Sequence, residues 1–518
     1  MDGTEVSDPG WGPFDHPLFD DPSAKALKRV GVVDVGSNSV RLVVFDGAAR
    51  SPAYFYNEKV MCGLGAGFNE TGRLNPEGRR RALAALKRFQ LLADGLGIAQ
   101  RSAVATAAVR EAEDGPDFIE EVKRETGLRL YVIDGAEEAR LSAQGVLLGW
   151  PEADGLVCDI GGSSMELAEV SGGRVGRCVT SPLGPLRLQS LKGGKRARRT
   201  HIAATLGELA AEFGAGRKRI YLVGGSWRAI ARLDMERRGY PLKVLHEYRM
   251  SRKPLSATLD WIGKHDTAEL RRMSGIGEAR MALVPLAAEV LGALLRIFRP
   301  DEVAVSSYGI REGLLYEQMP DQLRRRDPLI EACAFSEYKD ARLPGFGKSL
   351  YRFILPLFEG TPQTRLRLAR AACHLHDVTW RAHPDYRHEA CFDNVTRANL
   401  GGLTHEERVY LGLALLHRYK NSRSETRLTP LLGLLSEKEV TSAEVLGKAM
   451  RFGAMLAVDE PAKMGRLEWN ARKKLLRLHL TPHAQGLYGE VAEARFNSLA
   501  QSLGAKTDVR VLENAAAV

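Results

Sequence analysis

Hydrophobic residues along this chain fall into short runs and periodic stretches, and one arrangement of them occurs twice. An apolar run ends in Asp-x-Gly and small hydroxyl residues at 32–39 (Val-Val-Asp-Val-Gly-Ser-Asn-Ser) and again at 157–164 (Val-Cys-Asp-Ile-Gly-Gly-Ser-Ser). A second apolar run follows each of them, at 40–45 and 165–170. Two apolar runs joined by a turn of small residues predict a buried β-hairpin.

Elsewhere the apolar spacing alternates between that of helices and that of strands. Helical spacing predicts helices at 76–92, 137–148, 202–213 and 281–298. Short apolar runs predict strands at 101–108, 128–133, 219–223 and 302–306. From about residue 323 the pattern is helical to near the end, and only 475–480 has the pattern of a strand.

This order of elements predicts an α/β fold followed by an all-α domain. Residues 1–28 are rich in Asp, Pro and Gly and are expected to form a poorly ordered tail. Alternating strands and helices predict two α/β units, which we place at 29–150 and 151–320. The helical remainder, 321–518, is expected to form the last domain.

The composition favours a soluble, cytoplasmic protein with sizeable cores. Of 518 residues, 44% are hydrophobic and 27% are charged. The six cysteines are scattered and form no Cys-x-x-Cys pair, which indicates a reducing compartment and argues against a disulfide framework or a zinc ribbon. The acidic start predicts no signal peptide. Because the apolar stretch 281–298 contains Pro285, Glu289 and Arg296, we expect a buried helix there and no membrane partner.

The formal net charge of +10 suits a polyanionic partner, although a solvated basic surface without a partner is an open alternative. Two basic clusters stand out, Lys192, Lys195, Arg196, Arg198 and Arg199 in one and Arg324, Arg325 and Arg326 in the other. Neither contains interleaved aromatic residues, and no helix-turn-helix, zinc-finger or RNA-binding signature is present. Nucleic acid is therefore not the expected partner.

The two repeated turns have the chemistry of phosphate cradles. Residues with little or no side chain allow backbone N–H groups to approach an anion. Asp34 and Asp159 would repel a bare phosphate, so a cation is expected between each carboxylate and the phosphate. One such turn is common in β-proteins, but two predict facing lobes that grip one phosphate chain.

Three other local features could belong to the same site. Arg110 follows a predicted strand. Its guanidinium could donate two hydrogen bonds to a phosphate, or the residue could simply cap a helix. Glu137 and Glu138 begin a predicted helix, where acids usually complement the helix dipole. Adjacent helical residues point about 100° apart, so at most one of this pair can face a phosphate and orient a water. Gly224-Gly225-Ser226 follows a predicted strand and is either a third cradle or a plain turn.

In combination these motifs resemble the exopolyphosphatase/guanosine-pentaphosphate phosphatase (Ppx/GppA) family over residues 30–318. The matching segments are 34–39, 105–112, 135–140, 159–167, 182–184, 224–226 and 309–316 (Gly-Ile-Arg-Glu-Gly-Leu-Leu-Tyr). The resemblance implies two ribonuclease-H-like lobes around a cleft, similar to actin, sugar kinases and chaperone ATPases. It also implies Mg²⁺-dependent hydrolysis of the terminal phosphoanhydride of inorganic polyphosphate, or of the 5′ phosphate of guanosine pentaphosphate.

The resemblance assigns roles to individual residues. It implies that Glu138 is the base that orients the attacking water and that Arg110 contacts the terminal phosphate. Asp34, Asp159 and Glu166 are implied to hold the metal. The implied phosphate-binding residues are Gly36, Ser37, Asn38, Gly161, Gly162, Ser163, Ser164, Gly224, Gly225 and Ser226.

Two positions depart from the usual pattern of the family. Ser163 stands where relatives often have a third glycine, and because it is small we expect the turn to survive. Trp227 stands where relatives often carry glycine, beside the place of the nucleoside in actin-like folds. Our hypothesis is that Trp227 fills that place and disfavours guanosine, with ordinary packing as the alternative.

The C-terminal region resembles the HD-type metal phosphohydrolase core of long family members. The residues that carry this resemblance are His374, His376, Asp377, His388 and His417, with Asp459 as a loose distal match. No histidine lies in the preceding helix, around 346–357, where such a site normally needs one. We therefore predict a metal-free, structural HD-like domain that closes the cleft and lengthens a basic channel. The alternative is a second active site, in which His-Asp and a distant His hold Mg²⁺ or Mn²⁺.

The sequence thus predicts an exopolyphosphatase, with guanosine pentaphosphate hydrolysis as the first alternative. A non-catalytic polyphosphate or alarmone sensor and an actin-like ATPase or sugar kinase are alternatives of other classes. Inorganic polyphosphate is the expected partner, and Mg²⁺ is the expected cofactor, with Mn²⁺ and a monovalent cation left open. A homodimer is implied by the resemblance alone.

Overall fold

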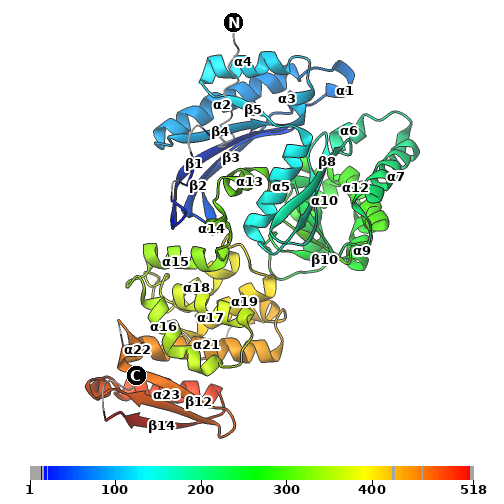
Figure 1. Ribbon diagram of the computed structural model, residues 1–518. Helices are drawn as coiled ribbons and strands as arrows, with labels where there is room; N and C mark the ends of the chain where they lie inside the picture. Colours follow the sequence, from blue (N-terminus) through cyan, green and yellow to red (C-terminus); the bar gives the residue numbers. More distant parts are fainter. Residues whose placement is uncertain (1–12, 15–16, 20, 423–425, 458, 514–518) are drawn as a thin grey trace. The chain divides into compact units, whose positions relative to one another are not determined.

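The computed structural model describes residues 13–14, 17–19, 21–422, 426–457 and 459–513. The chain divides into two compact units, Met1–Asp327 and Pro328–Val518 (Figure 1). The first unit consists of two lobes, each built around one β-sheet, and the second unit is mainly helical.

The first lobe contains the first predicted hairpin. Its strands are β1 (Ala26–Val35), β2 (Ser39–Ala48), β3 (Pro52–Met61), β4 (Gln100–Ala105) and β5 (Leu130–Val132), and its helices are α1 (Phe68–Thr71), α2 (Pro76–Gly95), α3 (Ala107–Glu111) and α4 (Gly115–Thr126). The sheet order is β3-β2-β1-β4-β5, with β1, β2 and β3 antiparallel and β4 and β5 parallel to β1.

Helix α2 begins where its sequence predicts. Asn75 caps it by accepting a hydrogen bond from the amide of Gly78 (2.8 Å), and Pro76 occupies the first turn, where its missing N–H costs nothing. Leu86 and Phe89 are buried against the sheet of the first lobe. The helix continues to Gly95, slightly beyond the predicted end at residue 92.

The second lobe contains the second predicted hairpin. Its strands are β6 (Gly155–Ile160), β7 (Met165–Ser171), β8 (Arg174–Ser181), β9 (Arg219–Val223), β10 (Arg249–Ser251) and β11 (Glu302–Val305). The accompanying helices are α5 (Gly135–Gly149), α6 (Pro185–Gln189), α7 (Gly194–Phe213), α8 (Gly225–Arg237), α9 (Arg252–Ile262), α10 (Thr267–Ser274), α11 (Glu278–Met281), α12 (Val284–Phe298), α13 (Ile310–Glu317) and α14 (Asp321–Arg324). The sheet order is β10-β11-β9-β6-β7-β8.

Helices α5 and α13 link the two lobes. In Figure 1, α5 lies along the second sheet beside β8, whereas α13 lies beside the strands of the first lobe. The two helices approach so closely that a Cβ on Gly313 would lie 1.9 Å from the carbonyl oxygen of Leu141, and one on Gly145 2.2 Å from that of Gly309. Only glycine therefore fits at positions 145 and 313, where α5 and α13 cross.

The apolar stretch predicted as one helix is bent into α11 and α12. The segment Glu278–Phe298 is long and apolar enough to span a membrane by length and composition. Leu291 and Leu294 of α12 are fully buried in the core of the second lobe, together with Phe298. The segment is therefore a core helix of this unit, as its sequence predicts.

The second unit is helical but not all-α. Its helices are α15 (Pro328–Asp340), α16 (Phe346–Ile354), η1 (Leu355–Phe358), α17 (Gln363–Leu375), α18 (Arg387–Arg397), α19 (His405–His417), η2 (Thr426–Leu428), α20 (Thr429–Leu432), α21 (Glu437–Leu456), α22 (Pro461–Met464), η3 (Pro482–Leu487) and α23 (Glu490–Ser502). A sheet of order β12-β13-β14 joins them.

The sheet of this unit corrects the all-α prediction. Strand β13 (Leu475–Leu480) is the predicted one, and it pairs with β12 (Gly465–Asn470) and β14 (Lys506–Val511). Leu476, Leu478 and Leu480 are buried, so alternate residues of β13 enter the core. β14 is exposed at nearly every position, so its sequence carries no apolar signal of a strand.

The N-terminal segment also differs from the expected poorly ordered tail. Residues 1–12, 15–16 and 20 lie outside the described residues. Phe14, Leu18 and Phe19 are buried in a core cluster shared with the first lobe, and β1 begins at Ala26, before the expected boundary at residue 29. Burial of these three large apolar side chains stabilises the segment even though most of its residues are polar.

Candidate active site

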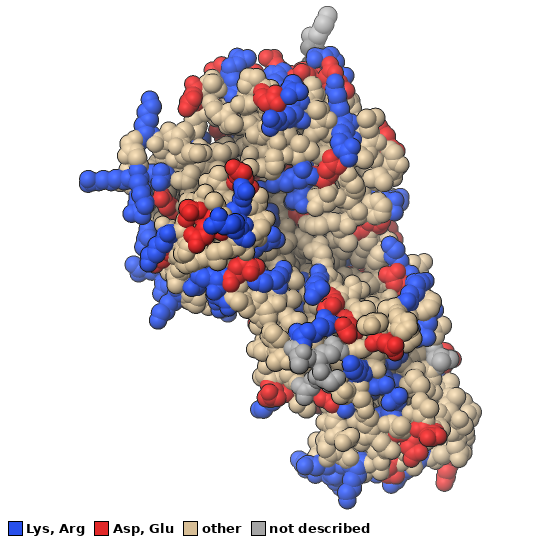
Figure 2. Space-filling model, turned by 180° about the vertical axis from the view of Figure 1, so that it is seen from behind, with Lys and Arg blue, Asp and Glu red and all other residues tan. Residues whose placement is uncertain are grey.

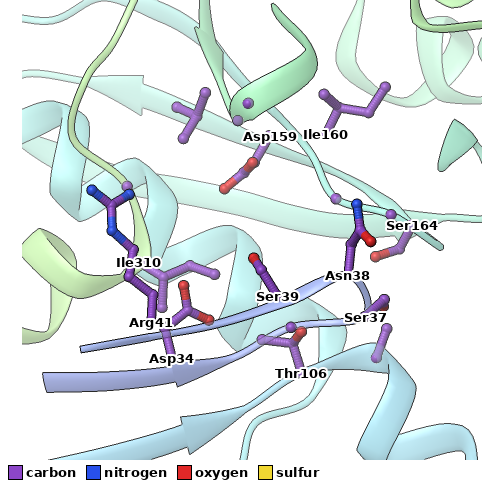
Figure 3. Close-up of a pocket in the computed structure, with 18 of the residues that line it drawn as sticks. Asp34, Ser37, Asn38, Ser39, Arg41, Thr106, Asp159, Ile160, Ser164 and Ile310 are labelled. Carbon is purple, nitrogen blue, oxygen red and sulfur yellow. The ribbon is translucent and has the colours of Figure 1, made fainter. Parts of the chain in front are cut away.

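A cavity between the two lobes collects most of the predicted site residues. Strands β1 and β2 approach it from the first lobe and β6 from the second, so that Asp34 and Asp159 come from opposite sides (Figure 3). The predicted residues that line it are Asp34, Gly36, Ser37, Asn38, Glu138, Asp159, Gly161, Gly162, Ser164, Gly224 and Gly225. Arg110, Ser163, Glu166 and Ser226 are not among the lining residues.

The two hairpin turns have the same geometry and touch each other. The amide of Gly36 donates to the carbonyl oxygen of Ser39 (3.1 Å), and that of Gly161 donates to the carbonyl oxygen of Ser164 (3.0 Å). The hydroxyl of Ser163 donates to that of Ser37 across the cleft (3.1 Å). Ser163 therefore joins the two turns instead of facing the cavity, and the turn survives its substitution for glycine.

Strand pairing fixes what each hairpin presents to the cleft. Asp34 on β1 pairs with Arg41 on β2, which pairs with Lys59 on β3, so the three side chains form a row on one face of the sheet. At the equivalent positions of the second lobe, Asp159 on β6 pairs with Glu166 on β7. The first hairpin thus presents Asp34, Arg41 and Lys59 to the cavity, whereas the second presents Asp159, with Glu166 buried beside it.

Glu138 lies at the start of α5, where the helix cap directs it into the cavity. Asp134 caps the helix by accepting a hydrogen bond from the amide of Glu137 (2.8 Å). The side chain of Glu137 faces away from the cavity and pairs with Arg140, whereas Glu138 is 5% exposed and lines the cavity. The geometry therefore selects Glu138 from the acidic pair.

Arg110 lies behind Glu138 rather than in the cavity wall. Its Nη1 donates to the carbonyl oxygen of Ile133 (2.7 Å) and to Oε2 of Glu138 (3.4 Å). In this geometry Arg110 holds the Glu138 carboxylate in place.

The buried acids of the cleft resist ionisation. Burial, followed by the negative charges of Glu166 and Asp159, raises the pKa of Glu138 well above its usual value. Burial and Asp159 raise the pKa of Glu166 to about 8, and burial raises that of Asp159. Ser142 donates to Asp159 and Thr180 donates to Oε1 of Glu166 (3.0 Å), but among the described residues the buried Oε2 of Glu166 has no hydrogen-bond partner.

Asp159 and Glu166 offer oxygen ligands to a hard cation. Three mutually repelling carboxyl groups with an unsatisfied oxygen are what a cation would stabilise. Within the described ranges, no three His, Cys, Asp or Glu side chains are grouped to hold a metal ion by themselves. Mg²⁺ sites in phosphoryl transfer use one or two carboxylates together with waters and substrate oxygens, so this pair suits a cation that arrives with phosphate.

Five basic residues of the cavity were missed by sequence reasoning. They are Arg41, Lys59, Arg228, Arg280 and Arg311. Burial, followed by repulsion from Arg280 and Arg41, lowers the pKa of Lys59 to about 8, and burial with Arg311 lowers that of Arg41 to about 10. Nη1 of Arg311 lies 3.4 Å from Oδ2 of Asp34.

The sequence contains information that could have placed two of these five residues in the cavity. Arg41 is the hairpin partner of Asp34, so the register around the turn predicts that both face the same side. Arg311 belongs to the segment 309–316, which carried part of the family resemblance. Lys59, Arg228 and Arg280 reach the cavity only through long-range folding.

The third turn is part of the site, but the hypothesis on Trp227 is wrong. Gly224 has a φ of 109°, and a Cβ there would lie 3.0 Å from Oδ1 of Asp159. Trp227 is fully buried in the core of the second lobe and does not line the cavity, and Ser226 is also buried. The guanidinium of Arg280 covers Gly225, where a Cβ would lie 2.3 Å from its Nη1.

In the second unit, the HD-like residues are engaged by other groups. Nδ1 of His374 lies 2.5 Å from Oε2 of Glu337, and Nδ1 of His376 lies 2.8 Å from the carbonyl oxygen of Cys373. Asp377 accepts two hydrogen bonds from the Arg342 side chain (2.8 and 2.6 Å). Burial, followed by Arg418, lowers the pKa of His376 to about 4, so this imidazole is neutral at pH 7.

The remaining HD-like residues also have other neighbours. Nε2 of His388 lies 3.1 Å from Nζ of Lys420, and Nδ1 of His417 lies 3.2 Å from the Lys420 carbonyl oxygen. Asp459 is exposed. A lysine and an arginine thus stand beside the groups that the resemblance assigns to a metal.

The match of the first unit to a family model decides its classification. Residues 43–322, more than half of the chain, match the model of the Ppx/GppA phosphatase family. The chain belongs to the Ppx/GppA phosphatase family. Residues 347–509 match the model described as exopolyphosphatase, C-terminal. The Ppx/GppA match thus covers the cleft except for β1, the first hairpin turn and the start of β2.

Two curated proteins illustrate the range of Ppx/GppA relatives. The chain is 25% identical over 456 residues to Retrograde regulation protein 2 of Saccharomyces cerevisiae, which spans 80% of this chain and 77% of the relative. It is 26% identical over 311 residues to Exopolyphosphatase 1 of Mycobacterium tuberculosis, which spans 57% of this chain and 89% of the relative.

A solved structure confirms the predicted two-lobed fold. The crystal structure of an exopolyphosphatase from Cytophaga hutchinsonii matches 56% of this chain and 98% of that chain, with a TM-score of 0.52 and 24% sequence identity. At this identity the match establishes the shared Ppx/GppA fold and nothing about the substrate.

Proposed function

We propose that the chain is an exopolyphosphatase, which hydrolyses the terminal phosphoanhydride of inorganic polyphosphate and releases orthophosphate with the help of Mg²⁺. The observation that carries this proposal is the division of charge in the cleft. Five cationic side chains and two glycine-rich turns face the same cavity as a single buried glutamate, Glu138. So many cations around small backbone turns suit a ligand made of phosphate groups alone.

The five basic side chains of the cavity would position the phosphate groups of the substrate and neutralise their charge. Arg41 and Lys59 extend from neighbouring strands of the first lobe, and Arg228, Arg280 and Arg311 reach the cavity from other elements. Phosphoryl transfer depends mostly on holding the phosphates and neutralising their charge. Exposed N–H groups of the two turns serve the same purpose without a side chain.

The acidic side supplies the base. Glu138 lies in the cavity wall, with Arg110 fixing its carboxylate, and can accept a proton from a water that attacks the terminal phosphorus. Burial, followed by the charges of Glu166 and Asp159, raises the pKa of Glu138, so neutralising those two charges would favour the ionised form that acts as a base. Mg²⁺ held by Asp159 and Glu166, with Asp34 across the cleft, would supply this neutralisation and bind phosphate oxygens.

The proposal is tested by phosphate release from long-chain polyphosphate with Mg²⁺. Glu138→Gln removes the base while keeping the shape, so kcat should fall by about 10²–10⁴-fold with polyphosphate binding retained. Glu137→Gln is the matched control, because Glu137 is adjacent in sequence but pairs with Arg140 outside the cavity. Its kcat should stay within about twofold of the wild type.

The same assay separates the other candidates. Faster hydrolysis of guanosine pentaphosphate than of polyphosphate would make the nucleotide the substrate. Phosphate transfer to an acceptor other than water would indicate a kinase. A sensor would bind polyphosphate tightly and release no phosphate in the wild type, an outcome that the relative named as a regulation protein makes worth testing.

A further inference from the structure

A chain of alternating charges leads from the cleft to its outer rim. Oε2 of Glu138 lies 3.4 Å from Nη1 of Arg110, and Nη2 of Arg110 lies 3.6 Å from Oε1 of Glu111. Oε2 of Glu111 in turn lies 3.4 Å from Nη1 of Arg187. The Glu138 side chain is buried, whereas those of Glu111 and Arg187 are 32% and 42% exposed. The chain therefore runs from the proposed base to the solvent.

The outermost ion pair of this chain, Glu111–Arg187, joins the two lobes, and we call it the rim pair. Glu111 is the last residue of α3 in the first lobe, and Arg187 lies on α6 in the second. Beside the rim pair, the side-chain amide of Asn69 on α1 donates to the hydroxyl of Ser190, which follows α6. Two polar contacts thus hold the lobes together at this rim.

Each side of the rim is built onto one of the two hairpin turns. In the first lobe, the amide of Thr106, at the start of α3, donates to the carbonyl oxygen of Val35 at the end of β1 (3.2 Å). In the second lobe, the amide of Leu186 on α6 donates to the carbonyl oxygen of Gly162 (2.9 Å). Because each helix is tied to its own turn, separation of the two turns would break the rim pair.

Arg110 is shared between two carboxylates. Its distances to Glu138 and Glu111, 3.4 and 3.6 Å, both exceed the length of a strong charge-assisted hydrogen bond, which is about 2.7–2.9 Å. Burial raises the pKa of Glu138, and Arg110 acts in the opposite direction. Any group that attracts Arg110 away from Glu138 therefore weakens the base. Arg187 neutralises Glu111 and so reduces this attraction.

We propose that Arg187 is a positioning residue for the base: through Glu111 it keeps Arg110 in place when the two lobes are closed. With the rim pair formed, the charge of Glu111 is neutralised and Arg110 stays on Glu138. With the lobes apart, the unpaired Glu111 competes for Arg110. The base is thus fixed in the closed cleft, where bulk water is excluded from the reacting groups. This inference rests on the proposed function, which gives Glu138 the role of base.

The general surface charge does not explain the rim pair. On the face shown in Figure 2, Lys and Arg side chains are spread over the surface with Asp and Glu among them. Ion pairs such as Arg177–Glu212 (3.8 Å) join two elements of the same lobe. The rim pair differs in two respects, since it joins different lobes and its acid also contacts the arginine that contacts the base.

Steady-state hydrolysis of long-chain polyphosphate with Mg²⁺ tests the positioning role. Arg187→Gln should lower kcat about tenfold, which is less than the loss expected on removal of the base. KM should stay within about twofold, because Arg187 is not among the described residues that line the cavity. Adding Glu111→Gln should recover most of the lost kcat, because no acid then competes for Arg110. Arg187→Lys keeps the charge and should stay within about threefold of the wild type.

The matched control is Arg177→Gln, which breaks a similarly exposed ion pair of the second lobe. Its kcat should stay within about twofold of the wild type. Exposed ion pairs contribute little to stability, so all of these variants should keep the melting temperature of the wild type. Loss of kcat without loss of stability separates a positioning role from a merely structural one.

Three results would overturn the positioning role in an active enzyme. They are an unchanged kcat in Arg187→Gln, a rise in KM alone, and a double variant whose kcat is as low as that of Arg187→Gln. The proposed function fails separately. If the wild type hydrolyses guanosine pentaphosphate and not polyphosphate, the proposed substrate is wrong, and the same variants decide the role of Arg187 on the nucleotide. A wild type that releases phosphate from neither substrate overturns both proposals.

Discussion

At the scale of single residues, the cleft is organised by strand register. Asp34, Arg41 and Lys59 are cross-strand neighbours, so fixing the direction of one of them fixes the direction of all three. The row brings a lysine into a site already crowded with arginines. Burial, followed by repulsion from Arg280 and Arg41, lowers the pKa of this lysine to about 8, so Lys59 is a basic group of the cleft that titrates near physiological pH.

Lys59 therefore predicts a pH dependence of substrate binding. Bound phosphate favours the charged lysine, so affinity is constant below pH 8 and weakens as the pH rises through about 8, where the free enzyme loses this proton. KM for polyphosphate, measured from pH 6.5 to 9.5, should rise above pH 8 in the wild type. Lys59→Arg keeps its charge over this range and should show no such rise, and an identical rise in both enzymes would contradict the assignment.

Residue identities in the site were only partly predictable. Glu138 was recoverable because helix geometry allows one of two adjacent acids to face the cleft, and the Asp134 cap settles which one. Arg41 was recoverable from the hairpin register. Trp227 and Arg280 were not, because whether a side chain enters a core or covers a turn depends on packing between distant segments.

At the scale of elements, the first unit uses one hairpin design twice for two purposes. Both turns close with the same Gly–Ser backbone hydrogen bond, at 36–39 and at 161–164. The residue opposite the aspartate is Arg41 in one hairpin and Glu166 in the other. This single difference gives the first hairpin a cation beside its aspartate and the second hairpin a second acid.

The crossing of α5 and α13 is predicted to be intolerant of any side chain. Gly313→Ala would place a methyl group on the carbonyl of Leu141, so we expect a loss of about 1–3 kcal/mol in the free energy of unfolding and reduced activity, because Glu138 and Arg311 lie on these helices. Gly207→Ala is the matched control, at an open position within α7. It should stabilise the protein by about 0.5–1 kcal/mol. Urea denaturation of both variants measures the difference, and equal stability would contradict the packing account.

The sequence predicts the position of helices and strands that have a periodic apolar pattern, and it misses those that lack one. The hairpins, α2 and β13 follow from periodicity and caps. Helix α7 begins at Gly194 instead of residue 202, because its first turns contain basic residues with no apolar stripe. Strand β14 forms by pairing with β13 rather than by burying its own side chains.

At the scale of the whole molecule, the proposed activity requires a cation that binds both the acids of the cleft and the phosphate oxygens of the polymer. Because Asp159 and Glu166 are buried and mutually repelling, chelation of divalent cations with EDTA should abolish phosphate release, and added Mg²⁺ should restore it. Glu166→Gln should raise the Mg²⁺ concentration for half-maximal rate at least about tenfold. Full activity in EDTA would contradict a metal role for these acids.

The position of the attacked phosphorus tests the central claim most directly. Long-chain polyphosphate is hydrolysed to a limited extent in H₂¹⁸O with Mg²⁺, and the label is located by mass spectrometry. A water held by Glu138 at the terminal phosphorus predicts one ¹⁸O in each released orthophosphate and a polymer that is shorter but unlabelled. Unlabelled orthophosphate with ¹⁸O at the end of the remaining polymer, or labelled internal fragments, would contradict the account.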